Sequence, residues 1–244
     1  ILDRKKRSLF LSRDRFGEKP LYYGWQGGSF LFGSTLHALK QHTDWVGKIN
    51  RQALSLLTQY NYIPAPHSIY EGIKKLEPGT WFELTWEHGD WQERIGTYWS
   101  ALGAAERARA NPFLGSFQDA SDILENSLQR IIEQQMLADV PLGAFLSGGI
   151  DSSAIVALMQ SQSSQPVRTY TIGFDNPAYD ESSVAEAVAK KLGTSHTTCQ
   201  LKETDIFDLI FRLPNIYDEP FADASQLPTA LVSQIARRDA TVAL

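Results

Sequence analysis

The chain has 244 residues and a net charge of −5; 43% of its residues are hydrophobic and 21% are charged. These values are typical of a globular protein with one large or two ordinary domains, and they exclude a long disordered chain. No apolar stretch is long enough to span a membrane, and the first 30 residues lack the apolar core of a signal peptide. The single cysteine, Cys199, excludes an internal disulfide framework, so a cytoplasmic protein is expected.

The charge is divided unevenly along the chain. Residues 1–100 carry 13 Lys and Arg against 10 Asp and Glu, whereas residues 101–244 carry 10 against 18. Because nucleic acids bind basic surfaces, the acidic half argues against nucleic acid as the main ligand. It is compatible with ATP, whose charge a magnesium ion partly neutralises.

The first hundred residues are predicted to form one domain built mostly of strands. Apolar and aromatic runs separated by turn signals predict strands at residues 8–12, 20–25, 30–34, 80–86 and 91–98. Helices are predicted at 35–41 and 51–60, the second capped by Asn50. The small and polar residues at 101–116 then indicate a linker between domains.

A second domain is predicted over residues 117–244. Its first helix, at 117–136, has apolar residues at helical spacing, which predicts a buried face made of Ile123, Leu124, Leu128, Ile131 and Ile132. Strands then alternate with helices: strands at 143–146, 167–174, 195–201 and 242–244, helices at 152–161, 181–192 and 226–238. This alternation predicts an α/β fold with a doubly wound, mostly parallel sheet.

The most informative segment follows the first strand of that sheet and reads Ser147-Gly148-Gly149-Ile150-Asp151-Ser152-Ser153. A strand, a tight turn and a helix place unpaired N–H groups and the positive helix end together, which favours an anion. The two glycines are expected to allow close approach of the ligand and to tolerate positive φ, and the three serines add hydroxyl donors. Because the lysine of a Walker A loop is absent, a pyrophosphate site fits better than γ-phosphoryl transfer.

Asp151 is the candidate metal ligand of this loop. Its charge would repel a bare phosphate, so its presence makes sense if a divalent cation lies between the two. The alternative is that Asp151 caps the helix through backbone N–H groups.

Three segments carry a resemblance to a known family. The loop resembles the pyrophosphate loop of the ATP-pyrophosphatase superfamily. Its flanks resemble glutamine-dependent asparagine synthetases, in the segments RDRFGEKPLYY (13–23), DVPLGAFL (139–146) and DEPFADASQLPT (218–229). The resemblance covers nearly the whole chain and implies the end of an N-terminal-nucleophile glutaminase domain (αββα) at 1–100, followed by the start of an ATP-pyrophosphatase domain.

The resemblance also implies an activity. Members of the family activate the β-carboxylate of aspartate with ATP and Mg²⁺, and ammonia from glutamine then displaces AMP. The implied ATP-binding residues are Leu146, Ser147, Gly148, Gly149, Asp151, Ser152, Ser153, Ile172 and Gly173, with Leu146 and Ile172 beside the adenine and Asp151 on the metal. The implied partners are small molecules, with no nucleic acid and no membrane, and a homodimer of the full-length protein is expected.

Other polar residues are given less specific roles. Asp175, Asp180 and Glu181 are interpreted as solvated loop acids, with an approach to the ribose or the metal as the alternative. Asp218, Glu219 and Asp223 are interpreted as an acidic cluster with either a ligand role or a helix-start role. Cys199 is interpreted as a core residue, the histidines lack metal-ligand spacing, and 13–15 is interpreted as a charged turn that holds the two domains together.

The chain starts without Met and stops where a strand begins, so it is expected to be an internal piece. In that case the catalytic cysteine would precede Ile1, a second acidic, glycine-rich motif would follow Leu244, and the piece alone would be inactive. Two alternatives stay open: an amidotransferase of the same build acting on a sugar acid or a β-lactam precursor, and a non-catalytic remnant that binds nucleotide or a partner chain.

Overall fold

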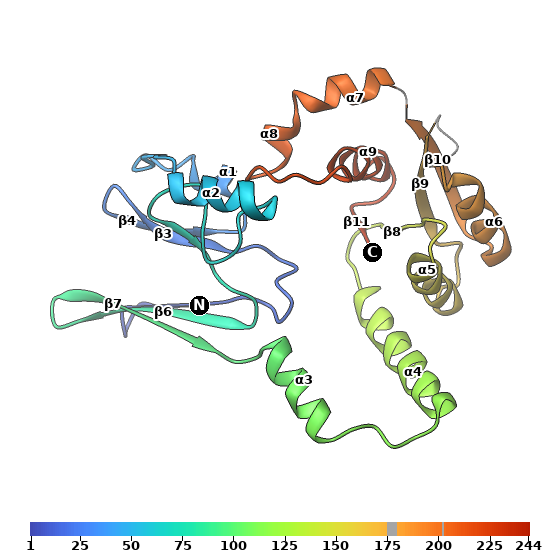
Figure 1. Cartoon of the computed structure of the whole chain (residues 1–244), viewed down its shortest axis with the longest axis horizontal. Helices are drawn as coiled ribbons and strands as arrows, with labels where there is room; N and C mark the ends of the chain where they lie inside the picture. The colour runs from blue at the N-terminus through green and yellow to red at the C-terminus, as the bar shows by residue number, and fades with distance from the viewer. Residues whose placement is uncertain (175–179, 202) are drawn as a thin grey trace. The chain divides into compact units, whose positions relative to one another are not determined.

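The computed structural model describes residues 1–174, 180–201 and 203–244. It divides the chain into two compact units, the first made of residues 1–113 and 214–223, the second of residues 114–213 and 224–244 (Figure 1). The segment 214–223 thus belongs to the first unit, although the sequence places it inside the predicted second domain. None of the helices in the described parts of the chain is long and apolar enough to cross a membrane.

The first unit contains two antiparallel sheets. One has the order β1–β2–β6–β7, with β1 (Leu2–Asp3), β2 (Ser8–Ser12), β6 (Thr80–Glu87) and β7 (Asp90–Thr97). The other has the order β4–β3–β5, with β3 (Tyr22–Gln26), β4 (Ser29–Gly33) and β5 (Ile73–Lys75). The strands predicted over residues 8–34 and 80–98 are confirmed, because alternating apolar residues and Gly-containing turns are specific signals for antiparallel strands.

Two apolar clusters hold these layers together. Leu11, Tyr23, Leu76 and Phe82 form a buried cluster between the two sheets. The other cluster joins the β4–β3–β5 sheet to helices α1 (Leu36–Leu39) and α2 (Arg51–Tyr60), which lie over it in Figure 1. As predicted, the Asn50 side chain caps α2, accepting hydrogen bonds from the N–H groups of Gln52 and Ala53. The unit thus has one helical layer on two sheets; the αββα glutaminase fold stays a prediction.

The segment predicted as a linker contains a helix that we did not predict, α3 (Ala101–Ala110). The Ser100 hydroxyl caps it by accepting a hydrogen bond from the N–H of Gly103, and eight of its ten residues are Ala, Leu or Arg, which favour helix. None of its residues is buried. A search for apolar residues at helical spacing therefore cannot detect this helix, which is why the segment was predicted to be a linker.

The second unit has a parallel sheet of order β10–β9–β8–β11. Its strands are β8 (Leu142–Phe145), β9 (Arg168–Phe174), β10 (Ser195–Leu201) and β11 (Val242–Ala243), and every pairing is parallel. Helices α4 (Phe117–Gln135), α5 (Ile150–Gln162) and α6 (Ser182–Leu192) lie on one side, and α9 (Gln226–Ala236) lies on the other (Figure 1). The predicted doubly wound α/β sheet is confirmed for this unit.

Each face of the parallel sheet has its own core. Ala144 and Leu146 pack with Val156 and Met159 on the α5 side. Phe145 belongs to the opposite cluster, around Tyr170, on the α9 side. Because neighbouring residues of a strand point to opposite faces, a continuous apolar run such as 144–146 is needed when both faces are covered.

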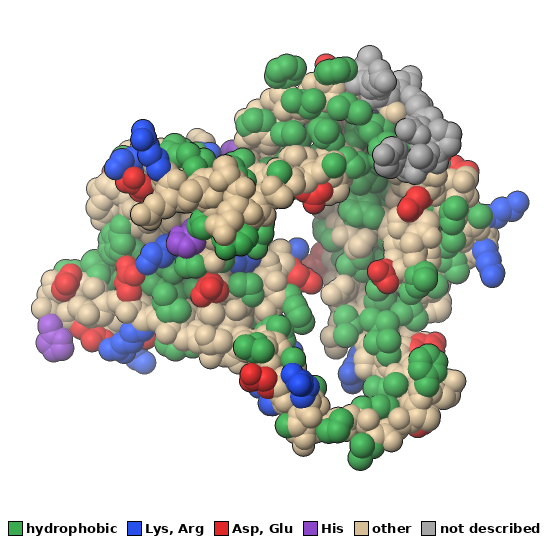
Figure 2. All heavy atoms as spheres, in the orientation of Figure 1, with side chains coloured by type: hydrophobic (Ala, Val, Ile, Leu, Met, Phe, Trp, Pro, Cys, Tyr) green, Lys and Arg blue, Asp and Glu red, His purple; other side chains and the backbone are tan. Residues whose placement is uncertain are grey.

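The predicted buried face of α4 is only partly buried. Ile132 is buried, but Ile123 is 55% exposed and Leu124 is 60% exposed. Hydrophobic side chains are visible along this helix in the space-filling view (Figure 2). Two further helices, α7 (Glu203–Ile210) and α8 (Leu213–Ile216), were not predicted from the sequence at all.

Candidate functional site

The candidate loop lies at the carboxyl end of β8, between this strand and α5. From β8 the chain builds the sheet outward through β9 to β10, whereas β11 pairs with the other edge of β8. The strand order therefore reverses at β8. Ligands of doubly wound sheets bind at such a reversal, outside the carboxyl ends of the strands, so the loop stands where the fold places a binding site.

Hydroxyl groups of the loop hold its backbone in shape. The Ser147 N–H donates to Ser152 Oγ at 3.1 Å, and the Gly149 N–H donates to Ser147 Oγ at 3.1 Å. The two hydroxyls are 2.8 Å apart, and Ser153 Oγ donates to the Gly149 carbonyl at 2.7 Å. The serines predicted as ligand donors thus also shape the turn, and a hydroxyl that now accepts can rotate and donate.

The two loop glycines do not have the positive φ that we predicted, whereas the close approach of a ligand stays a prediction. Neither has a positive φ, and Gly149 is the N-cap of α5 with φ −76°. At Gly148 a Cβ would lie 3.1 Å from Cβ of Val184, in the first turn of α6. The prediction of a left-handed turn is therefore wrong. Gly148 is needed for close packing against α6, so its substitution is expected to reduce stability as well as ligand binding.

Asp151 lies in the first turn of α5 and is exposed. Because Gly149 is the N-cap and no side chain caps this helix, the alternative that Asp151 is the cap is wrong. Among the residues that the structure describes, no group of three His, Cys, Asp or Glu could hold a metal ion. The metal role of Asp151 stays a prediction.

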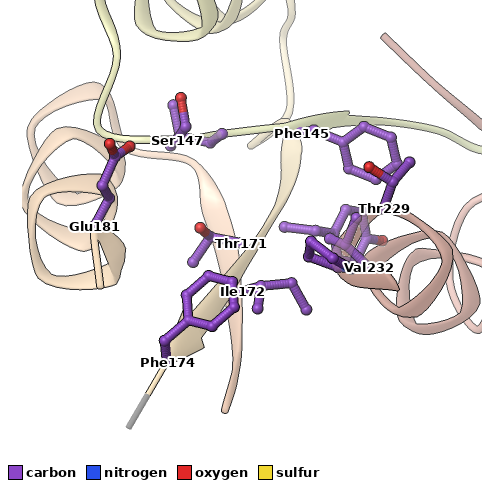
Figure 3. Close-up of a pocket in the computed structure, with 11 residues that line it drawn as sticks. Phe145, Ser147, Thr171, Ile172, Phe174, Glu181, Thr229 and Val232 are labelled. Carbon is purple, nitrogen blue, oxygen red and sulfur yellow. The ribbon is translucent and has the colours of Figure 1, made fainter. Parts of the chain in front are cut away.

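A pocket of about 240 Å³ opens beside the loop (Figure 3). Of the predicted ATP-binding residues, Leu146, Ser147 and Ile172 line it. Its other lining residues were not predicted to bind ATP: Phe145, Tyr170, Thr171, Phe174, Glu181, Pro228, Thr229 and Val232. Apolar side chains, among them Phe145, Ile172 and Val232, line most of the pocket, and Ser147, Thr171 and Thr229 add hydroxyl groups.

The remaining predicted residues do not line this pocket. Gly148, Gly149, Asp151, Ser152 and Ser153 lie in the loop and the first turn of α5. Gly173 faces the neighbouring strand, where an added Cβ would lie 2.2 Å from Oε1 of Gln200. The site therefore has two parts, an anion-type loop and an adjoining pocket, and the ATP-binding role of Gly173 stays a prediction.

Two acids after β9 do more than the solvated role we predicted. Asp180 Oδ1 accepts hydrogen bonds from the N–H groups of Phe174 at 3.2 Å and Ser182 at 3.1 Å. Its hydrogen bonds, first those to Ser182, hold the pKa of the Asp180 carboxyl below its usual value. Glu181 Oε2 accepts from the Gly148 N–H at 3.2 Å and so belongs to the site. Asp175, predicted together with them, lies outside the described residues.

The acidic segment 218–223 is placed elsewhere, in the first unit. Asp218 pairs with Nδ1 of His37 at 2.7 Å and accepts from the His37 N–H. Glu219 pairs with Lys75 at 2.5 Å, with side chains only 14% (Lys75) and 9% (Glu219) exposed, and also accepts from the Ile69 N–H. Within the first unit Asp218 thus contacts His37, and Glu219 forms a largely buried ion pair with Lys75, in place of the predicted helix-start role. The ligand role stays a prediction.

The charged turn at 13–15 acts within the first unit. Arg13 donates to the carbonyls of Lys19, Leu76 and Gly17. Asp14 accepts from the N–H groups of Glu18 and Lys19. Arg13 thus braces a loop of the first unit, and its role in holding two domains together stays a prediction. Cys199 is half-buried in β10 and packs against the Tyr170 cluster, in agreement with a core role.

Comparisons with known proteins agree with this arrangement. The model of a glutamine amidotransferase domain matches residues 1–99, and that of asparagine synthase matches residues 124–244. A Methanocaldococcus jannaschii protein with the provisional name of glutamine-hydrolysing asparagine synthetase 2 is 36% identical over 100% of this chain and 46% of its own length. Bacillus subtilis glutamine-hydrolysing asparagine synthetase 3 is 30% identical, over 90% of this chain and 36% of its own.

Among solved structures, an NMN synthetase from Francisella tularensis is a distant likeness, with a TM-score of 0.36 and 18% identity over 53% of each chain. This chain spans less than half the length of the two curated relatives.

A doubly wound sheet with a serine- and glycine-rich loop at its reversal point is typical of α/β proteins that bind a ligand at this edge of the sheet. The two matching models together cover most of the chain. The chain belongs to the family of glutamine-hydrolysing asparagine synthetases.

Proposed function

We propose that the protein to which this chain belongs makes asparagine from aspartate, with ATP as the activating substrate and glutamine as the source of ammonia. In this proposal the second unit activates the carboxylate, and the first unit is part of the domain that hydrolyses glutamine. The single observation that carries it is the Ser147–Ser153 loop at the reversal point of the sheet, beside a pocket, in a chain of this family.

The two parts of the site suit the two parts of ATP. The pocket offers apolar side chains of Phe145, Ile172 and Val232, against which an adenine ring can pack. The loop offers backbone N–H groups at the N-terminus of α5, a 13-residue helix whose dipole favours negative charge there. We therefore assign the base to the pocket and the phosphates to the loop.

A magnesium ion fits this arrangement. Asp151 offers an exposed carboxylate in the first turn of α5, next to the proposed phosphate site. Because Mg²⁺ in nucleotide sites is commonly held by one or two carboxylates together with phosphates and water, a single protein ligand here is sufficient. When bound, the ion would neutralise phosphate charge and polarise the phosphorus–oxygen bonds.

The loop is suited to stabilise a leaving group. In the proposed reaction a carboxylate oxygen attacks the α-phosphorus of ATP, and the bond to the bridging oxygen breaks with its electron pair on pyrophosphate. Ammonia then attacks the acyl carbon, and AMP leaves. Negative charge grows on the departing pyrophosphate, so the N–H donors of Ser147, Gly148 and Gly149 would stabilise it more than they stabilise bound ATP.

A substitution in the pocket separates the two assignments. We expect Val232→Trp, which fills the pocket from α9, to weaken MgATP binding by about tenfold or more, because the base loses its space. Binding of magnesium pyrophosphate, which needs the loop alone, is expected to change less than about twofold. Isothermal titration of each ligand into the two proteins measures both effects.

Val140→Trp, at a 40% exposed valine outside the pocket, is the control and should leave both affinities unchanged. Equal weakening of MgATP and magnesium pyrophosphate by Val232→Trp would contradict the division into base and phosphate sites. Failure of the unsubstituted protein to bind either ligand would contradict the proposed function.

A further inference from the structure

One donor of the anion-type loop is already paired with a negative charge of the protein. The Ser147 and Gly149 N–H groups donate to serine hydroxyls, whereas the Gly148 N–H donates to the Glu181 carboxylate at 3.2 Å. A hydroxyl can rotate to accommodate a phosphate, but a carboxylate can only accept hydrogen bonds. Glu181 therefore stands where a phosphate oxygen would bind, with the same sign of charge.

The position of Glu181 is built into the fold. Its neighbour Asp180 ties the end of β9 to the start of α6 through the N–H groups of Phe174 and Ser182. The Glu181 carbonyl in turn accepts from the N–H groups of Val184 and Ala185, which fixes its backbone at the first turn of α6. In Figure 3 the side chain extends from this turn toward the loop.

The loop backbone is packed too closely against α6 to move toward it. A Cβ on Gly148 would lie 3.1 Å from Cβ of Val184 and 3.4 Å from Cβ of Glu181, so the loop and the start of α6 are in close contact. A phosphate that takes the Gly148 N–H must displace the Glu181 carboxylate and then lie near it. Asp151, in the first turn of α5, adds a second negative charge to this end of the sheet.

Two carboxylates beside a phosphate site repel a bare polyphosphate. A divalent cation reverses the sign of the interaction, because it attracts carboxylates and phosphate oxygens alike. We propose that Glu181 is a specificity-determining residue that makes polyphosphate binding at this loop dependent on a divalent cation. This inference rests on the proposed function, since it takes the loop to be the phosphate site.

The test is a titration of the full-length protein with pyrophosphate, once with Mg²⁺ and once with EDTA. The unsubstituted protein is expected to bind much more tightly with Mg²⁺. Glu181→Gln keeps an oxygen that can accept from the Gly148 N–H but removes the charge, so binding in EDTA should tighten by about tenfold. Glu186→Gln removes the same charge from the same helix, where Glu186 accepts from the Thr198 hydroxyl, and should leave both affinities unchanged.

The possible results of these titrations separate the inference about Glu181 from the proposed function. If the unsubstituted protein binds magnesium pyrophosphate but Glu181→Gln leaves the affinity in EDTA unchanged, the inference is overturned and the proposed function stands. If Glu181→Gln binds pyrophosphate more weakly with Mg²⁺ but no more tightly in EDTA, the inference is also overturned, and Glu181 is a metal ligand instead. If pyrophosphate and MgATP bind under neither condition, the proposed function fails together with the inference.

Discussion

In the full-length protein, Asp151→Ala is expected to lower the rate of ATP-dependent amide formation by about 100-fold or more, while glutamine hydrolysis stays measurable. The reason is that Asp151 lies in the second unit, beside the loop assigned to the phosphates, and is the carboxylate assigned to the metal. Amide formation is measured as asparagine produced from aspartate, MgATP and ammonium. Glutamine hydrolysis is measured as glutamate released in the absence of aspartate.

The stability of the Asp151→Ala protein is expected to change little. Asp151 is exposed and caps no helix, so its removal takes away only a favourable interaction with the start of α5, worth about 0.3–1 kcal/mol. Asp122→Ala, which removes an exposed aspartate from α4, is the control and should retain both activities. Equal loss of both activities in Asp151→Ala would show that Asp151 serves the fold instead.

The largest effect on stability is expected in the first unit, at Lys75. Its ammonium group pairs with Glu219 and donates to the Ile63 carbonyl, and both charged side chains are largely buried. Lys75→Met leaves the Glu219 carboxylate buried without its counter-charge, which should lower the free energy of unfolding by about 3 kcal/mol. Burial, with the charges of Glu219 and Asp218, also raises the pKa of the adjacent Tyr22 hydroxyl, so Tyr22 stays neutral beside the carboxylate.

Urea denaturation measures this effect, and a second substitution identifies its cause. Lys75→Met combined with Glu219→Gln removes both charges and should recover part of the loss. Lys48→Met is the matched control, because Lys48 pairs with Glu71 at 2.7 Å but is 70% exposed. It should lower the free energy of unfolding by less than about 1 kcal/mol. Similar losses at Lys75 and Lys48 would contradict the assignment of a buried pair.

Local patterns explain what the sequence could predict. The strands at 8–12 and 195–201 have the predicted bounds, since apolar alternation and flanking turn residues act over a few positions. The loop at 147–153 was found because strand, turn and helix signals coincide there. Its glycines were interpreted through positive φ, yet Gly148 is required by its contact with Val184, 36 positions further along the chain. No local pattern encodes such a contact.

The missed parts of the site depend on tertiary contacts. Glu181 stands among several acids after β9, and only the fold selects it to bond with the Gly148 N–H. Glu219 and Lys75 are 144 positions apart, so their pairing leaves no periodic signal in the sequence. Val232 and Thr229 reach the pocket because α9 covers the second face of the sheet. Helix α3 was missed because it has no buried face.

The central claim is that ATP is cleaved between its α- and β-phosphates to activate aspartate. Phosphorus NMR of the full-length protein with aspartate, ammonium and MgATP tests it directly, because each product has its own signal. The account predicts AMP and pyrophosphate in equal amounts, formed together with asparagine and dependent on aspartate. Formation of ADP and phosphate, or cleavage of ATP only when another carboxylate replaces aspartate, would contradict it.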